Sequence, residues 1–266
     1  MSKVLLASIA AVVGTVSSAA MGQIIYDNQV TLPGSGELGL VTHPGGGFGG
    51  ADASALTSPD TTFGATANTA TAFRLADDFT IPVGEVWTIT GANVFGYTTV
   101  AGSPNLTAIG ATLRIFSDDP NGAASGTVVA GDTTTNVQTA ASWAGSNAGG
   151  IWRVTSTTLL TNNRRIQTST STFAPVVLGP GTYWLDFAIT SSTGAVFTPV
   201  MSLANSSGVT GNARQFNGTT YVPLVDAGST SAKGVPFQLI GTIVPAPSSL
   251  ALLGLGGLVA ARRRRS

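Results

Sequence analysis

The side chains that most often catalyse reactions are scarce in this chain of 266 residues. It contains no cysteine, one histidine and only two glutamates. His43 would have to be the base of any Ser-His-Asp triad, but no Gly-x-Ser-x-Gly motif is present to supply the nucleophile. Glycoside hydrolysis requires two facing carboxylates, for which Glu37, Glu85 and Asp186 are the candidates. The sequence favours a protein that is not an enzyme, with a secreted glycan hydrolase as the lesser alternative.

Metal binding would have to rely on oxygen ligands, because the histidine and cysteine that zinc prefers are nearly absent. Asp118 and Asp119 open the segment 118–122, Asp-Asp-Pro-Asn-Gly, which could bind calcium but is also a common turn sequence. Asp77 and Asp78 are neighbours in a predicted strand, so their side chains should point to opposite faces. The sequence favours a turn at residues 118–122 and predicts no metal or other cofactor.

Aromatic side chains suggest a third kind of site, one that binds carbohydrate. Sugar rings stack on exposed aromatic faces, and four residues are candidates for such contacts: Trp143, Trp152, Trp184 and Tyr221. The same side chains could instead pack in the core. A carbohydrate- or exopolysaccharide-binding module is therefore the main alternative function.

The elements that would position these residues are predicted to be β-strands. Short runs of β-branched and aromatic residues alternate with Gly, Pro, Asn and Asp, and no window of the body keeps the spacing of an amphipathic helix. In the clearest strand, at residues 182–189, alternation predicts a core face of Tyr183, Leu185, Phe187 and Ile189, with Asp186 on the opposite face.

A second long strand, or a bent pair of strands, is predicted at residues 86–99. Its larger side chains are predicted to share one face, and two glycines, Gly91 and Gly96, allow a bulge or corner. The side chains of that face are Trp87, Ile89, Phe95 and Tyr97. Further strands are expected at residues 24–27, 78–81, 111–117, 127–130, 151–155, 165–168, 196–203, 213–217 and 237–243.

This pattern predicts an all-β fold, an antiparallel, jelly-roll-like β-sandwich that spans residues 23–243. Residues 34–71 are rich in Gly, Ser and Thr and poor in large apolar side chains. A segment of this composition is predicted to form a long flexible loop.

Charge is sparse and unevenly distributed. Five of the 12 cations lie in the two terminal segments, so the body carries seven cations against 12 acids, a net charge of −5. Its only adjacent basic pair is Arg164-Arg165. No nucleic-acid partner is expected, because such proteins concentrate cations on one face.

The first 22 residues have the order of a secretory signal peptide. Lys3 is followed by an apolar run and then by small residues, and cleavage is predicted between Gly22 and Gln23, with a cut after Ala20 as the alternative. The apolar run is shorter than the ~20 residues that cross a bilayer. The sequence therefore predicts export by the Sec machinery rather than a retained anchor.

Residues 244–266 have three parts: two prolines, Pro245 and Pro247, then an apolar stretch at residues 249–261, then a basic end made of Arg262, Arg263, Arg264 and Arg265. As a helix the apolar stretch would be about 20 Å long, against ~30 Å of hydrocarbon. The arginines would stay on the cytoplasmic side. A short transmembrane helix that associates with the membrane transiently is predicted.

This order resembles the PEP-CTERM protein-sorting signal, with Ala246 where that signal usually has Glu between the prolines. The resemblance implies an exosortase, a membrane-embedded transpeptidase that removes the tail, and delivery to the cell surface or the exopolysaccharide matrix. Residues 76–82, 87–89, 94–97 and 179–187 also resemble segments of exported PEP-CTERM-bearing proteins, many of them planctomycetal. The expected function is that of an exported, non-catalytic β-sandwich protein of the cell surface or extracellular matrix.

Overall fold

The computed structural model describes residues 22–29, 40–100, 106–121, 126–202 and 210–245 as an assembly of two main antiparallel sheets. The first has the order β1 (Gln23–Asp27), β15 (Phe237–Pro245), β5 (Glu85–Gly96), β10 (Gln167–Leu178) and β8 (Gln138–Trp143). The second has the order β14 (Tyr221–Pro223), β13 (Arg214–Asn217), β4 (Phe73–Ile81), β11 (Gly181–Ser191), β6 (Ala108–Phe116) and β7 (Val128–Gly131).

Two short sheets complete the architecture. β12 (Phe197–Pro199) pairs with β3 (Gly64–Thr66), and β2 (Asp52–Leu56) pairs in parallel with β9 (Ile151–Thr155). Two 3-10 turns, η1 (Phe48–Gly50) and η2 (Thr69–Thr71), are the only helical elements in the described ranges. The predictions of an all-β fold and of antiparallel sheets are confirmed.

No helix within the described residues is long and apolar enough to cross a membrane. The predicted signal peptide, up to residue 21, and the predicted sorting helix lie outside those residues.

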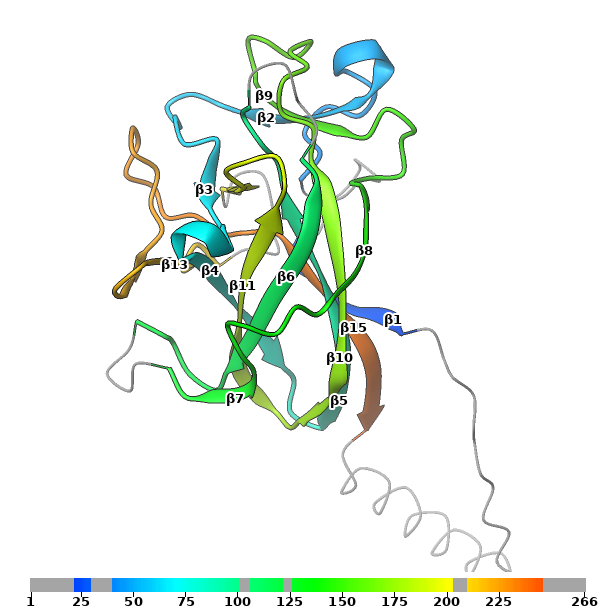
Figure 1. Cartoon of the computed structure of the whole chain (residues 1–266), viewed down its shortest axis with the longest axis vertical. Coiled ribbons are helices and arrows are strands. Elements are labelled where there is room, and N and C mark those ends of the chain that lie inside the picture. Colours follow the sequence, from blue (N-terminus) through cyan, green and yellow to red (C-terminus); the bar gives the residue numbers. More distant parts are fainter. Residues whose placement is uncertain (1–21, 30–39, 101–105, 122–125, 203–209, 246–266) are drawn as a thin grey trace, which may run out of the picture.

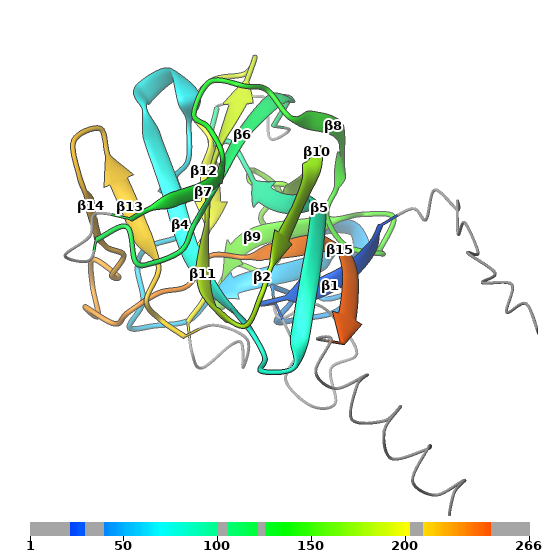
Figure 2. The same cartoon turned by 90° about the horizontal axis from the view of Figure 1, so that it is seen from below.

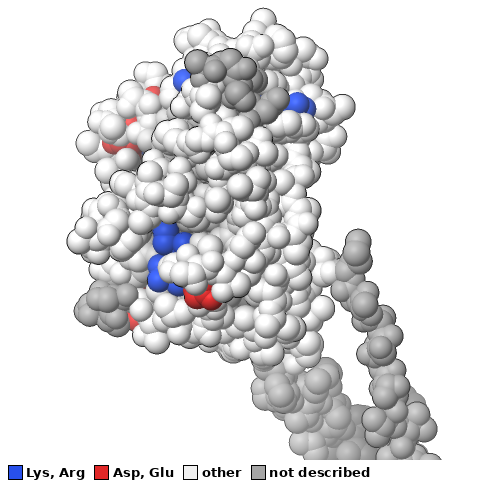
Figure 3. All heavy atoms as spheres, viewed as in Figure 1, with Lys and Arg blue, Asp and Glu red and all other residues white. Residues whose placement is uncertain are grey.

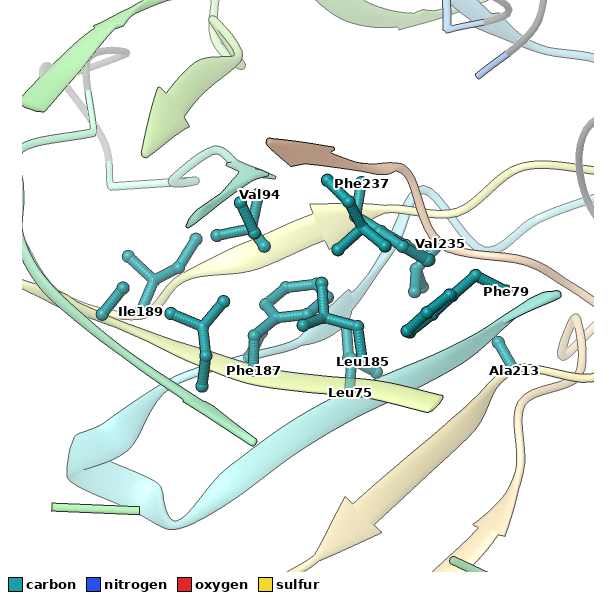
Figure 4. Close-up of a cluster of buried hydrophobic side chains, with 14 of the residues drawn as sticks. Leu75, Phe79, Val94, Leu185, Phe187, Ile189, Ala213, Val235 and Phe237 are labelled. Atoms are coloured by element: carbon teal, nitrogen blue, oxygen red, sulfur yellow. The ribbon is translucent and has the colours of Figure 1, made fainter. Parts of the chain in front are cut away.

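The facing sides of the two main sheets share one hydrophobic core. Figure 2 shows β5, β10 and β15 on one side and β4, β11 and β13 on the other. Leu185, Phe187 and Ile189 of β11 are fully buried in this core, and Tyr183 packs at its edge, so the predicted core face of this strand is confirmed. Figure 4 shows side chains of both sheets, such as Phe187 and Phe237, pointing into the same space.

A bulge in β5 reverses the face of its second half. In its pairing with β15, β5 has one extra residue between Ile89 and Gly91. Trp87 and Ile89 consequently belong to the main core, whereas Phe95 and Tyr97 belong to a second cluster. The prediction that all four share a face was wrong. One inserted residue inverts the alternation of everything that follows it.

The predicted flexible loop at residues 34–71 is replaced, from residue 40 onward, by ordered structure that includes β2 and β3. All five residues of β2 are buried. Ala53 and Ala55 pack with Trp152 and Val154 of β9. The small side chains that suggested disorder instead allow β2 to lie close against a strand with large ones.

The two ends of the molecule carry different elements. In Figure 1 the β2–β9 pair lies at the upper end, and β15 runs down to its last residue at the lower end. The strand predicted to end at residue 243 continues to Pro245, which pairs with Glu85. The predicted sorting signal therefore begins inside the sheet.

Candidate functional sites

The two ends of the predicted body lie on neighbouring strands. Gln23, which would follow the signal-peptide cut, is the first residue of β1 and pairs with Gly241 of β15. At the end of β15, Val244 pairs with Val86 and Pro245 with Glu85. Proline has no N–H to donate, so it suits the last position of a strand. The body thus starts and ends on two adjacent strands of one sheet.

The comparison with known families bears on this second end. Residues 244–265 match the model of the PEP-CTERM protein-sorting motif. The chain carries a PEP-CTERM motif. This motif marks an exported, membrane-associated protein that is sorted by its C-terminal signal, and it is recognised by an exosortase. No curated protein and no solved structure matches the chain, so no relative supports the resemblance of the body to planctomycetal proteins.

The match begins at Val244, within β15, and covers Pro245 and Pro247 together with all four terminal arginines. Of these residues the structure describes only Val244 and Pro245. Pro247, Arg262, Arg263, Arg264 and Arg265 lie outside the described residues. The described part of the PEP-CTERM motif is therefore a stretch of sheet that reaches the lower end of the body (Figure 1).

Asp186, a candidate catalytic acid, lies at the centre of a buried charge network. Its Oδ2 accepts from Arg74 Nε at 2.7 Å and from Arg114 Nε at 2.9 Å, and its Oδ1 accepts from the Tyr221 hydroxyl at 2.7 Å. Burial and the nearby Asp186 raise the pKa of Tyr221 far above its usual range. Because both carboxylate oxygens are engaged and Asp186 is fully buried, this network is suited to holding strands together rather than to receiving a substrate.

The other catalytic candidates that the structure describes, Glu85 and His43, interact with nearby side chains. Glu85 Oε2 accepts from Trp87 Nε1 at 2.7 Å on the other main sheet. His43 lies 2.9 Å from the hydroxyl of Thr42. Glu37 lies outside the described residues. The structure therefore does not bring the described candidate carboxylates, Glu85 and Asp186, together as a facing pair.

The two aspartates considered for calcium bond to protein groups, and Asp119 Oδ1 accepts from the backbone N–H of Asn121 within the turn. Asp119 forms an ion pair with Arg214 at 2.6 Å, and Asp118 Oδ1 accepts from the backbone N–H of Thr127 at 2.6 Å. The described residues contain no group of three or more His, Cys, Asp or Glu side chains that could hold a metal ion.

Asp77 and Asp78 of β4 have different environments, as expected of neighbours in a strand. Asp77 is 1% exposed and accepts from the backbone N–H of Val235 at 2.8 Å. Burial raises the pKa of Asp77 to about 8. Asp78 is partly exposed and accepts from the Thr210 hydroxyl at 2.7 Å.

The four candidate glycan contacts fall into two separate groups. Trp184 and Tyr221 pack together in a small cluster on the outer side of the second sheet, and they are 4% and 7% exposed. Trp152 is also 7% exposed. The expectation that these three present their faces to a sugar is therefore corrected, because each ring is covered by its own neighbours.

Trp143 and Trp152 are brought together by a residue that the sequence did not single out for binding carbohydrate. The guanidinium carbon of Arg165 lies 4.0 Å from the centre of the Trp143 ring and 5.7 Å from that of Trp152. Phe48, which is 46% exposed, contacts Trp152 edge-on at 6.0 Å. We call Phe48, Trp143, Trp152 and Arg165 the Trp–Arg patch.

A cavity of about 360 Å³ opens between β6, β7 and β10. Its lining is mostly apolar, and its two charged residues are already engaged. Arg114 pairs with Asp186, and Asp132 accepts bonds from its own turn at Thr134 and Thr135. The cavity thus offers a ligand no charged group that lacks a partner.

Proposed function

We propose that the protein is an exported, non-catalytic component of the cell surface or extracellular matrix, delivered as a folded body by its PEP-CTERM motif. The observation that carries the proposal is the position of that motif, which begins in the last two residues of β15. The two facing sheets are taken as a jelly-roll-like sandwich, and their common core supports this. Export by the Sec machinery before Gln23 and release by an exosortase complete the proposed route.

Cell fractionation with mass spectrometry of the mature termini tests this route. We expect a protein that starts at Gln23, lacks the arginine end and is found outside the cytoplasm. The double variant Pro245→Ala, Pro247→Ala should keep its tail and remain with the membrane fraction. Ala246→Glu, which restores the usual box, should be processed at least as completely as the natural chain. An intact chain of 266 residues in the cytosol would overturn the proposal.

A second candidate function is the binding of carbohydrate, and the Trp–Arg patch favours it. Trp143 is half-buried and has Arg165 over its ring, and Arg165 also lies near Trp152, which contacts the exposed ring of Phe48. Aromatic side chains that remain partly exposed beside polar groups suit ligands with both flat apolar faces and hydroxyls. A glycan array probed with the full-length chain tests this function, and silence on every glycan would reject it.

A further inference from the structure

The body has few cations, and more than half of them are paired with aspartates. Among the described residues, four of its seven cations form ion pairs with aspartates: Arg74, Arg114, Arg214 and Lys233. A fifth, Arg153, is 3% exposed and donates to Ser54 and to two backbone carbonyls. Figure 3 shows how sparse charged atoms are on one face of the molecule. Two partly exposed cations without a carboxylate partner remain, Arg164 and Arg165.

Arg165 is held in place by stacking instead of by charge. It lies over the ring of Trp143 and near that of Trp152, and its Nη2 donates to the carbonyl of Ala148 at 3.3 Å. Its Nε is buried without a hydrogen-bond partner in the described structure. Asp52, the first residue of β2, accepts through Oδ1 from Gly45 and Asn147 and not from Arg165, and its Oδ2 has no hydrogen-bond partner in the described structure. The guanidinium is therefore fixed in position with donors to spare.

The backbone beside Arg165 is shaped to admit it. Gly150 has a φ of +74°, a conformation that favours glycine, and a Cβ at this position would lie 3.0 Å from Arg165 Nε and 3.5 Å from Trp143 Cβ. A larger residue would push the guanidinium from its place. Glycine at position 150 therefore leaves room for the guanidinium of Arg165.

We propose that the Trp–Arg patch binds an acidic polysaccharide, through a salt bridge from Arg165 to a uronic-acid carboxylate and contact of the sugar with the exposed ring of Phe48 and the partly exposed ring of Trp143. The inference rests on the second candidate function above and names its ligand class. A guanidinium held in one orientation suits a carboxylate, because it can donate two parallel hydrogen bonds and loses little side-chain freedom on binding.

A uronic acid fits this arrangement better than an acidic peptide does. Its ring has a flat apolar face, and its carboxylate projects from the edge of that ring. The patch has the matching order, with aromatic faces next to a cation that lacks a carboxylate partner. Peptide carboxylates stand on flexible stems and have no ring to stack. A net charge of −5 on the body also disfavours binding of anions by overall attraction.

The test is affinity electrophoresis of the full-length chain, in detergent, through gels that contain polygalacturonate, a neutral galactan of similar length or polyglutamate. We expect polygalacturonate to retard the natural chain most strongly. Arg165→Gln should weaken this binding about tenfold or more, as expected for loss of a charged hydrogen bond. Arg165→Lys should restore only part of it, because lysine lacks the planar fork.

Arg164→Gln is the matched control. Arg164 is the adjacent residue, carries the same charge and stacks on a different ring, that of Phe63, at 4.2 Å. Arg164→Gln should change binding by less than about twofold, within the range of a surface charge that does not contact the ligand. Equal losses in the Arg164 and Arg165 variants, or equal retardation by polyglutamate, would overturn the proposed site in favour of diffuse attraction.

The outcomes also separate this inference from the function on which it rests. If neutral galactan binds as well as polygalacturonate and Arg165→Gln changes nothing, carbohydrate binding stands and the acidic ligand is wrong. If no glycan retards the chain, carbohydrate binding and the acidic ligand are both rejected, while the proposed sorting route is unaffected. Thermal melting of each variant shows whether a loss of binding reflects a loss of folding.

Discussion

Gln23 of β1 faces Gly241 of β15, so the first residue of the predicted mature body pairs with the last strand of that body. Among the described strands, β1 has no other neighbour in its sheet. The five-stranded sheet therefore cannot be completed until the segment next to the PEP-CTERM motif has been made. This order agrees with a chain that crosses the membrane unfolded and folds afterwards.

We expect truncation after residue 236 to prevent folding. It removes β15 and leaves β1 unpaired, and Phe237 and Leu239, both fully buried, would no longer fill the core. Each lost side chain corresponds to about 1.5–3 kcal/mol of burial. Far-ultraviolet circular dichroism and thermal melting of the truncated chain measure the effect.

Truncation after residue 243 is the matched control. Val244 is 46% exposed, and its removal with Pro245 takes away only the exposed end of the strand. This chain should melt within a few degrees of one that ends at Pro245. If the chain that ends at residue 243 fails to fold, the first residues of the sorting motif belong to the core.

Gly241→Ala should destabilise the sheet that the two ends share. A Cβ at this position would collide with the backbone carbonyl of Thr88 on β5, and backbone cannot move aside without breaking the pairing. We expect a loss of about 1–3 kcal/mol in the free energy of unfolding, measured with urea. Gly179→Ala, where the new Cβ would meet nothing within 4 Å, should change it by less than about 0.5 kcal/mol.

Asp186→Asn should be among the most damaging single substitutions. It would leave Arg74, whose side chain is 6% exposed, and Arg114 without their shared counter-charge. Breaking a buried ion pair in this way costs about 3–5 kcal/mol. Tyr221→Phe removes one bond to the same carboxylate and should cost about 1–2 kcal/mol. Equal unfolding midpoints for the two variants in urea would contradict this ranking.

Asp77 should make the protein less stable as the pH rises from about 5 to 8. Burial raises the pKa of Asp77 to about 8, although the hydrogen bond from the backbone N–H of Val235 lowers it. The charge of Asp78 adds to the rise and that of Arg214 opposes it. The folded state therefore keeps a proton that the unfolded chain releases near pH 4. Because the folded state binds more protons in this range, the free energy of unfolding falls with rising pH, by at most about 1.4 kcal/mol per unit.

Urea denaturation at several pH values, with Asp77→Asn beside the natural chain, isolates this contribution. The variant should show a flatter dependence between pH 5 and 8, since its amide does not titrate. Partial burial acts to raise the pKa of Asp60, but hydrogen bonds from Lys233 and Ser229 lower it overall. Asp60 therefore affects the pH dependence of stability only below this range. Parallel slopes for the two proteins would show that Asp77 is ionised in the folded state.

Sequence patterns predicted the buried face of a strand well where large apolar side chains alternate with polar or small ones. The alternation around Leu185 identified the core face of β11 because most of the opposite residues are polar or small, Trp184 being the exception. In β5 the same alternation failed after Gly91, since a glycine allows a bulge but does not show that one is present. The burial of β2 was missed because Ala53 and Ala55 carry no periodic signal of their own, and only the large rings of β9 make them a packing surface.

The candidate site was predicted in part for the same reason. Trp143 and Trp152 were identified by residue type, but the pairing of Arg165 with Trp152 across a β-bridge brings distant segments together. The adjacent arginines were visible in the sequence. Their lack of carboxylate partners was not, because ion pairs such as that of Arg214 with Asp119 join residues far apart in the chain.

The separation of the two ends of the body has an evolutionary consequence. Residues at the β2–β9 end contact one another and not the last residues of β15 (Figure 1). Substitutions that diversify the loops around Trp143 can therefore accumulate without disturbing delivery, and a changed tail leaves those loops intact. Related proteins with this arrangement could therefore change the proposed binding surface while keeping the same sorting signal.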